Sequence, residues 1–294
     1  MTTAAETLAR PARLSVGIRA WRFVTRHVLT AYSLLVVAFL MLPIAIVILF
    51  SFNQPTGRFN YVWHKFTVGN WIHWNSVLGI QSAVVTSLEV AALATAVATA
   101  LGTLIALALV RHRFVGSSVT NLVVFLPMAT PEIVMGSSLL TLFLNDANTI
   151  QLGFWTIFIA HVMFIISFVV VTVKARLIGF DRHLEEAAMD LGANEWVTFR
   201  KVTLPLIAPA LLSAALLGFA LSIDDFVITY LNAGAVQTFP IFVWGISRVA
   251  VPPQVNVVAS AIFLVAIVLG LVNVIWEYRS AKRSRGVSSP AAVV

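Results

Sequence analysis

The chain has 294 residues, of which 60% are hydrophobic and only 11% are charged, and its mean hydropathy is +0.94. This composition lies far outside the averages of soluble globular proteins and indicates a polytopic membrane protein. Cysteine is absent, which excludes a disulfide framework, a thiolate metal site and a cysteine nucleophile. The net charge of +7 is compatible with nucleic-acid binding or with membrane topology, and the positions of the basic residues decide between the two.

Six apolar segments are long enough to cross the ~30 Å hydrocarbon layer, which predicts an all-α integral membrane protein with six transmembrane helices. The predicted spans cover residues 28–50, 81–110, 117–144, 152–173, 206–230 and 257–276. The third span contains Pro127 and Pro131. Proline removes a backbone donor, so this span is predicted to be kinked or broken. The predicted domains are an N-terminal segment at 1–27, a six-helix transmembrane domain at 28–277 and a basic tail at 278–294.

The basic residues are distributed unequally between the two sides of the membrane. Six spans place both termini on one side, and 16 of the 19 lysines and arginines fall on that side. Only Arg58, Lys65 and Arg248 fall on the other. The positive-inside rule therefore predicts that both termini and the segment 174–201 are cytoplasmic. Topology and the attraction of basic residues to anionic lipid explain the net charge, so no nucleic-acid partner is predicted.

Residues 181–205 form the longest charged passage in the chain, and they predict two short helices joined by a glycine. Asp181 can cap the first helix because its side-chain oxygen can accept from N–H groups of the first turn. The apolar residues that follow lie at helical spacing and form one stripe. These residues are Leu184, Ala187, Ala188 and Leu191. Gly192 stands where a helix needs a left-handed residue to stop. Asn194 can cap a second helix, which Pro205 is expected to end.

The same passage carries a family resemblance. Glu186-Ala187-Ala188, three residues, Gly192, nine residues and then Val202-Thr203-Leu204-Pro205 resembles the EAA loop of ABC importer permeases, whose pattern is EAA-x3-G-x9-I-x-LP. Val202 replaces the usual isoleucine, a mild change of volume. In that family the loop fits a cleft on the ATP-hydrolysing subunit. The resemblance implies that Glu185, Glu186, Ala187, Ala188, Asp190 and Gly192 couple this chain to an ATPase. The alternative is an ordinary amphipathic surface hairpin.

Acidic residues inside the spans are candidates for a substrate pathway, because a carboxylate in hydrocarbon is costly unless it meets water or a partner. Asp224 and Asp225 lie in the fifth span. Adjacent helical residues point about 100° apart, so the two cannot form a facing dyad. One is expected to line the pathway while its neighbour meets another helix. Two carboxylates in a pore would attract a polycation and repel anions. The alternative is that the pair caps a helix break or fixes packing.

Two further acids are pathway candidates. Thr130-Pro131-Glu132 is typical of an N-cap followed by the first two residues of a helix, where Glu132 could simply complement the helix dipole. Glu89 lies in the outer part of the second span, where a structural role is the alternative. The polar residues His161, Asn121 and Asn273 are predicted to form hydrogen bonds between helices. No phosphate-binding loop, H-E-x-x-H motif or nucleophile with a nearby base occurs, so no catalytic residue, metal site or cofactor is predicted in this chain.

Several other stretches are similar to permease subunits of spermidine/putrescine ABC importers. They include residues 131–136, 151–155, 168–173, 191–193 and 222–227. The resemblance covers roughly residues 28–280 and implies the type I ABC importer permease (MetI-like) fold in a bacterial inner membrane. It further implies a second homologous permease, two copies of a cytoplasmic ATPase that bind ATP and Mg²⁺, and an extracytoplasmic substrate-binding protein. Polyamines are the substrate that it implies.

Three alternatives stay open on the sequence. The first is an ABC permease for another small solute. The second is a proton-coupled secondary transporter that uses Glu89, Glu132 or the Asp224-Asp225 pair as proton carriers, although the halves of the chain show no convincing internal repeat. The third is a membrane enzyme or anchor, for which the sequence offers no reactive constellation. The acid pair favours a cation over an anion as the solute.

Overall fold

The computed structural model describes residues 16–112, 115–145 and 150–287, with side chains described between residues 26 and 275 of these ranges. Residues 1–15 of the predicted N-terminal segment and 288–294 of the predicted basic tail lie outside the described residues, whereas 16–27 and 278–287 continue the first and last helices. The described chain is helical apart from its loops and two isolated β-bridges, which confirms the all-α prediction.

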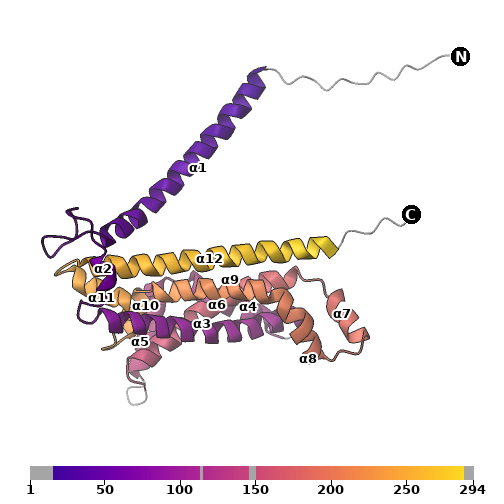
Figure 1. Ribbon diagram of the computed structural model, residues 1–294. Helices are drawn as coiled ribbons and strands as arrows, with labels where there is room; N and C mark the ends of the chain where they lie inside the picture. Colours follow the sequence, from indigo (N-terminus) through magenta and orange to yellow (C-terminus); the bar gives the residue numbers. More distant parts are fainter. Residues whose placement is uncertain (1–15, 113–114, 146–149, 288–294) are drawn as a thin grey trace.

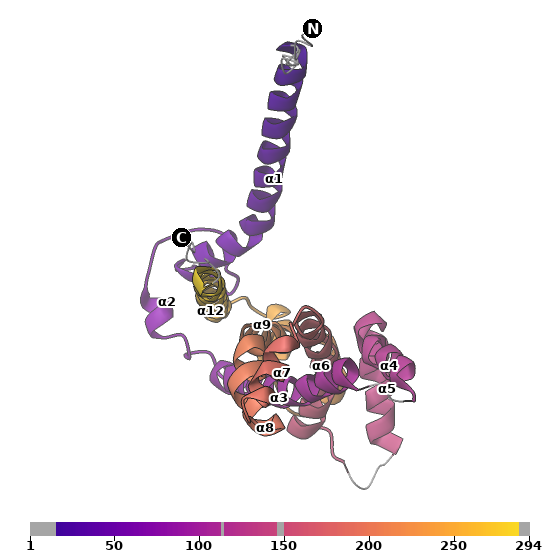
Figure 2. The same cartoon turned by 90° about the vertical axis from the view of Figure 1, so that its right-hand side faces the viewer.

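Three long helices form the centre of the bundle, namely α3 (Ile80–Arg111), α6 (Phe154–Ile178) and α9 (Leu204–Ile223). They lie side by side and share the largest buried apolar cluster (Figures 1 and 2). Glycine permits the closest approaches. A Cβ at Gly102 would stand 2.7 Å from the side chain of Val169, and one at Gly218 would stand 2.5 Å from that of Ile165. Small residues thus bring α3 and α9 against α6, as is usual where helices pack within a membrane.

The first and last helices are attached to this centre differently. Helix α12 (Pro253–Val287) runs along α9, whereas α1 (Val16–Ser51) leaves the bundle at an angle and contacts α12 (Figures 1 and 2). No residue of the most apolar stretch of α1 is buried. Large side chains such as Leu29, Leu34 and Phe39 are about two-thirds exposed. This surface is too apolar for water and requires lipid or a protein partner.

The predicted break in the third span is confirmed. Helices α4 (Ser117–Ala129) and α5 (Glu132–Asn145) meet at an angle of 107°. The break falls at Pro131, whereas Pro127 lies inside α4. The start of the second helix is shifted by one residue from its prediction, so that Pro131 rather than Thr130 precedes it. The Thr130 hydroxyl donates to the Leu126 carbonyl at 2.6 Å, and the Pro131 carbonyl accepts from the first turn of α5. Glu132 is consequently the first residue of α5.

Within the described residues, five continuous helices are long and apolar enough to cross a membrane. Their spans are Arg26–Ser51, Ile80–Arg111, Phe154–Ile178, Glu195–Ile223 and Pro253–Ile275. The α4–α5 pair supplies a sixth crossing, because α3 and α6 both end near α7 (His183–Asp190) and the pair returns the chain to the opposite end between them (Figure 1). In the same view, the first residues of α1 and the last of α12 point toward the α7 end.

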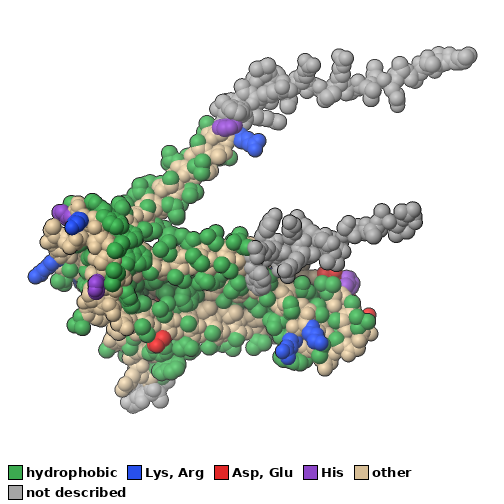
Figure 3. Space-filling view, in the orientation of Figure 1, with side chains coloured by type: hydrophobic (Ala, Val, Ile, Leu, Met, Phe, Trp, Pro, Cys, Tyr) green, Lys and Arg blue, Asp and Glu red, His purple; other side chains and the backbone are tan. Residues whose placement is uncertain are grey.

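The opposite end of the bundle carries the loop at 52–79 and three short helices, α2 (Gly69–Ile72), α10 (Val227–Asn232) and α11 (Phe239–Ser247). Buried amides order the loop: Asn53 donates to Asn60 at 2.6 Å, and Asn70 donates to the carbonyls of Ser51 and Asn53. Charged side chains gather mainly at the two ends of the molecule, and hydrophobic side chains cover the surface between them (Figure 3).

Candidate functional site

The segment 181–205 is called here the elbow. The start of its first helix and the turn at its centre agree with the prediction from sequence. The Asp181 carboxylate accepts from the backbone N–H of His183 at 3.1 Å, at the start of α7. Gly192 has a φ of +89° and ends α7. Its N–H donates to the Met189 carbonyl at 2.9 Å, and the next N–H, of Ala193, donates to Ala188 at 3.1 Å. A left-handed glycine with this pair of bonds is a standard helix stop.

The second half of the elbow differs from its prediction at one point. Asn194 caps α8 (Glu195–Thr198) as expected, because its side-chain oxygen accepts from the N–H of Val197 at 2.9 Å. The prediction that Pro205 ends this helix is wrong. A π-helical turn, η1 (Phe199–Thr203), follows α8, and the helix continues as α9. The wider turn removes the clash that a proline ring otherwise makes with the preceding turn, so Pro205 is accommodated near the start of α9.

Several large apolar side chains of the elbow are exposed. Leu191 is 89% exposed, Trp196 67%, and Leu184 and Met189 are also exposed. These side chains give the elbow its exposed apolar surface. The elbow itself extends beyond the bundle at the α7 end (Figure 1). Exposed apolar patches rimmed by charge are typical of protein–protein interfaces.

The six residues predicted to couple to an ATPase are therefore not equivalent. Glu186, Ala187 and Asp190 are exposed, as is Gly192, and Ala188 is half-buried. Glu186 pairs with His183 at 3.0 Å on the outer face of α7. Glu185 instead points toward the bundle, where it meets Arg111 at the end of α3 and the hydroxyl of Thr203 in η1. Only 15% of the Glu185 side chain is exposed, so it does not share the outward surface.

The predicted fifth span is interrupted, and Asp225 lies at the interruption. Helix α9 ends at Ile223 and α10 begins at Val227. The carboxylate of Asp225 accepts from the N–H of Thr229 at 2.8 Å and from that of Ile228 at 3.4 Å, which satisfies the first turn of α10. Only 2% of the Asp225 side chain is exposed. Of the two alternatives drawn from the sequence for this residue, the geometry favours the cap at a helix break.

A histidine from another helix completes the surroundings of Asp225. His161 of α6 contacts Asp225 at 3.4 Å, Thr229 at 2.9 Å and Ser222 at 2.6 Å. The Thr229 hydroxyl donates its one proton to Asp225 at 2.7 Å, so it must accept from Nε2 of His161. Nδ1 of His161 then faces the Ser222 hydroxyl. This network ties α6, α9 and α10 together and confirms both the interhelical role predicted for His161 and the prediction that one acid of the pair meets another helix.

The other two interhelical predictions are also confirmed. Asn121 of α4 accepts a hydrogen bond from Lys174 of α6, and Asn273 of α12 donates to Ser213 of α9 at 2.9 Å.

Asp224, unlike Asp225, is exposed. The charges that act on its carboxylate are those of Asp225 and, more weakly, of Glu132 on the adjoining helix α5. The proximity follows from packing, because α5 and α10 touch at Gly136, where a Cβ would stand 2.8 Å from the side chain of Leu231. Glu132 is exposed as well. Asp224 and Glu132 are thus two accessible acids, called here the acidic pair, on neighbouring segments that are distant in the sequence.

Glu89 does not belong to this pair. It is exposed on α3, and among the described residues its carboxylate has no hydrogen bond or ion pair. Neither the network around Asp225 nor the acidic pair includes it.

An aromatic group beside Asp224 was not anticipated from the sequence. The ring of Phe226 stacks on Tyr230 with centroids 5.3 Å apart and also meets Trp244 of α11 at 5.3 Å. The guanidinium of Arg248 lies 4.7 Å from the centroid of the Trp244 ring. The spacing of Phe226 and Tyr230 by four residues was the available signal for the first of these contacts.

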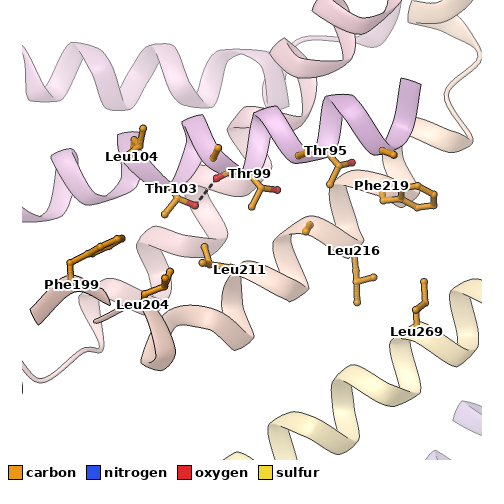
Figure 4. A pocket seen from close by; sticks show the side chains of 14 residues that line it. Thr95, Thr99, Thr103, Leu104, Phe199, Leu204, Leu211, Leu216, Phe219 and Leu269 are labelled. Atoms are coloured by element: carbon orange, nitrogen blue, oxygen red, sulfur yellow. Dashed lines mark hydrogen bonds between the residues drawn. The ribbon is translucent and has the colours of Figure 1, made fainter. Parts of the chain in front are cut away.

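A groove of about 740 Å³ opens between α3, α9 and α12 (Figure 4). Alanine, leucine and phenylalanine side chains dominate its lining, and Thr95, Thr99 and Thr103 of α3 add three hydroxyls one turn apart. The hydroxyls of Thr95 and Thr99 have no hydrogen-bond partner among the described residues. None of the four predicted pathway acids lines this groove, so it is distinct from the acidic pair.

Comparison with known proteins assigns the fold and the site to a family. A family model described as the inner membrane component of binding-protein-dependent transport systems matches residues 98–286. The chain belongs to this family. It is a permease subunit of an ABC importer and a multi-pass inner-membrane protein, which confirms the predicted class of transport component.

Three relatives align with this chain over most of their own length. The chain is 39% identical over 237 residues to the spermidine/putrescine transport system permease protein PotC of Escherichia coli K12, covering 79% of this chain and 87% of that protein. It is 38% identical to PotC of Haemophilus influenzae, covering 84% and 94%. It is 36% identical to the putrescine transport system permease protein PotI of E. coli K12, covering 84% and 88%.

Solved structures agree on the fold. A chain of a bacterial ABC transporter involved in the import of the acidic polysaccharide alginate matches with a TM-score of 0.61 at 16% identity, covering 89% of this chain and 99% of that one. A chain of an amino acid ABC transporter matches with a TM-score of 0.54 at 17% identity, covering 74% and 100%. The predicted type I ABC importer permease fold is therefore confirmed.

Proposed function

We propose that this permease subunit imports polyamines of the spermidine/putrescine class and is driven by a separate ATPase that binds the elbow. The observation that carries the solute is the 39% identity to PotC over 237 residues. The exposed pair of Asp224 and Glu132 supports it, because accessible carboxylates attract cationic amines and repel anions. A permease for another small cationic solute is the second candidate, which the same acidic pair would also serve.

The proposal includes three kinds of partner. A second homologous permease would cover apolar surface within the membrane, and the unburied α1 and the groove beside α3 supply such surface. Two copies of a cytoplasmic ATPase would bind the outward apolar surface of the elbow, and that ATPase would hold the ATP and Mg²⁺. A substrate-binding protein would deliver the solute from outside. A chain of the alginate transporter solved with its periplasmic binding protein matches this fold with a TM-score of 0.59.

The proposed orientation places both termini and the elbow in the cytoplasm. The excess of lysine and arginine on that side supports it. The common direction of the ends of α1 and α12 toward α7 agrees with it (Figure 1). In this orientation Asp224 and Glu132 lie at the extracytoplasmic end of the bundle, where α2, α10 and α11 are found.

The docking role of the elbow can be tested by cross-linking, because the chain has no cysteine of its own. A single cysteine at Leu191, which is 89% exposed, is expected to cross-link to a cysteine introduced in the cleft of the ATPase. A cysteine at Leu78, which is 97% exposed at the opposite end of α3, is the matched control and should remain unlinked. Cross-linking is measured in membranes that contain the complete transporter. Equal cross-linking from both positions, or no cross-linking from residue 191, would contradict the docking role.

The role of Asp224 in the pathway predicts a change in transport without a change in folding. Asp224→Asn keeps the shape of the side chain and removes one charge of the accessible pair. We expect ATP-dependent uptake of radiolabelled spermidine by proteoliposomes to fall severalfold, with the larger effect at low ionic strength, because exposed charges act over about a Debye length. Glu89→Gln, which changes an acid outside the pair, is the control and should retain uptake. Wild-type uptake in Asp224→Asn would remove this residue from the substrate route.

A further inference from the structure

A polar cluster joins the elbow to the bundle. Arg111, in the last turn of α3, donates to the carboxylate of Glu185 and to the Thr203 hydroxyl, the second at 3.2 Å. Thr203 also donates to Glu185. The three residues come from α3, α7 and η1, which are separated by up to 92 residues in the sequence. Each member of the cluster contacts the other two, so the cluster is closed.

The cluster is shielded from solvent, unlike the rest of the elbow. Thr203 is completely buried, and the side chains of Glu185 and Arg111 are 15% and 31% exposed. The other charged pair of α7, His183 with Glu186, is 86% and 61% exposed. Ion pairs fixed by further hydrogen bonds and shielded from water hold geometry, whereas exposed pairs contribute little.

A second bond acts in parallel with the cluster. Arg182, directly before α7, donates to the carbonyl of Val110 at 2.8 Å. That carbonyl belongs to the last turn of α3, where carbonyl groups lack helical partners and cationic side chains are favourable. The N-terminal half of α7 is thus attached to the end of α3 at two points, while its C-terminal half presents Met189 and Leu191 to solvent.

We infer that the cluster of Arg111, Glu185 and Thr203 is the mechanical link through which movement of α7 reaches the transmembrane bundle. It makes Glu185 and Arg111 positioning residues for coupling rather than contacts for the ATPase. Helix α3 packs along both α6 and α9, so a displacement applied to its end is applied to the packed centre of the bundle. Thr203 is the last residue of the π-helical turn η1, which leads directly into α9, so the cluster is also joined to α9. The inference rests on the proposed docking of the ATPase on the elbow.

The link can be tested in the chain itself by distance measurement. Spin labels at Leu101→Cys on α3 and His183→Cys on α7 occupy exposed positions outside the groove and outside the apolar surface of the elbow, in a chain without other cysteines. In the assembled transporter we expect one narrow distance distribution. Glu185→Gln and Arg111→Gln should each broaden it, because α7 loses its fixed attachment to α3. The double exchange Arg111→Glu with Glu185→Arg restores an ion pair and should narrow the distribution again. Unchanged distributions in both single variants would overturn the inference.

The second measurement is the coupling of transport to ATP hydrolysis. A residue with a merely structural role would not give a loss of coupling that the double exchange reverses. The amount of radiolabelled spermidine transported per ATP hydrolysed is expected to fall roughly two- to thirtyfold in Glu185→Gln, the range found for mutations along coupled networks, and to recover in the double exchange. Asn121→Ala is the matched control. It cuts the hydrogen bond to Lys174 that joins α4 and α6 without touching α7, and should leave both the distances and the coupling unchanged.

Two outcomes separate this inference from the proposed function. If the cysteine at Leu191 fails to cross-link to the ATPase in the wild-type chain, the docking role fails, whereas the distance distributions still report on the cluster. If Glu185→Gln does not accumulate in the membrane, Thr203→Val provides the test, since it removes one hydroxyl and keeps the side-chain shape. A broadened distribution in that variant supports the link, and an unchanged distribution counts against it.

Discussion

Replacing Gly192 by proline is expected to abolish ATP-dependent uptake while leaving the protein inserted in the membrane. Gly192 has a φ of +89°, and the proline ring fixes φ near −65°. Proline also removes the N–H that donates to Met189 at 2.9 Å. The turn between α7 and α8 must then refold, and the apolar surface of the elbow changes shape. Insertion is retained because the turn lies outside the packed bundle. Uptake of radiolabelled spermidine and ATP hydrolysis, measured together, should show hydrolysis that is no longer accompanied by transport.

A graded series at the same position separates backbone strain from crowding. A Cβ at residue 192 would have no atom within 4 Å, so any effect of a small substitution comes from the backbone conformation. Gly192→Ala should cost about 1–2 kcal/mol of turn stability and give intermediate uptake. Gly192→Asn should be milder, because asparagine tolerates the left-handed region. The proline variant should be the most severe of the three. Normal coupled uptake in Gly192→Pro would contradict the role of the elbow in coupling.

The parts of the elbow that could be predicted from sequence are those fixed by neighbouring residues. Asp181, Gly192 and Asn194 each act on N–H or C=O groups within a few positions of themselves, so their residue types determine the local structure. Pro131 breaks the third span for a similarly local reason. The prediction at Pro205 also rested on a local effect, but it was wrong, because the helix continues through this proline. The π-helical turn η1, which sequence rules do not predict, precedes the proline and accommodates it, so the helix continues as α9.

The roles of the acids could not be predicted because they depend on distant partners. Asp224 and Asp225 are identical in type and adjacent, yet only Asp225 meets His161, which lies on another helix. Glu185 and Glu186 differ in the same way, since only Glu185 meets Arg111, 74 residues earlier. Hydropathy likewise located the spans but could not show that α1 would stay unburied, because apolar residues suit lipid and a protein partner equally.

Asp225→Asn is expected to destabilise the chain, in contrast to Asp224→Asn. The two carboxylate oxygens of Asp225 accept from the N–H groups of Ile228 and Thr229 and from the Thr229 hydroxyl, and one of them also faces His161. An amide presents one acceptor in place of two, and its NH₂ group must face donors that were satisfied before. Leaving buried donors unpaired costs about 1–3 kcal/mol each. Thermal unfolding in detergent should therefore shift to lower temperature in Asp225→Asn.

The comparison of the two variants assigns distinct roles to the two acids. Asp224→Asn should unfold at the wild-type temperature and lose uptake, because its carboxylate is exposed and satisfies no buried group. Asp225→Asn should lose uptake only in proportion to its lost stability, since its carboxylate holds α10 against α6 rather than meeting the solute. Ser222→Ala offers a graded control: it removes one partner of His161 without disturbing the cap on α10 and should shift unfolding by a smaller amount. A wild-type unfolding temperature in Asp225→Asn, together with lost uptake, would reverse the assignment and place Asp225 in the substrate route.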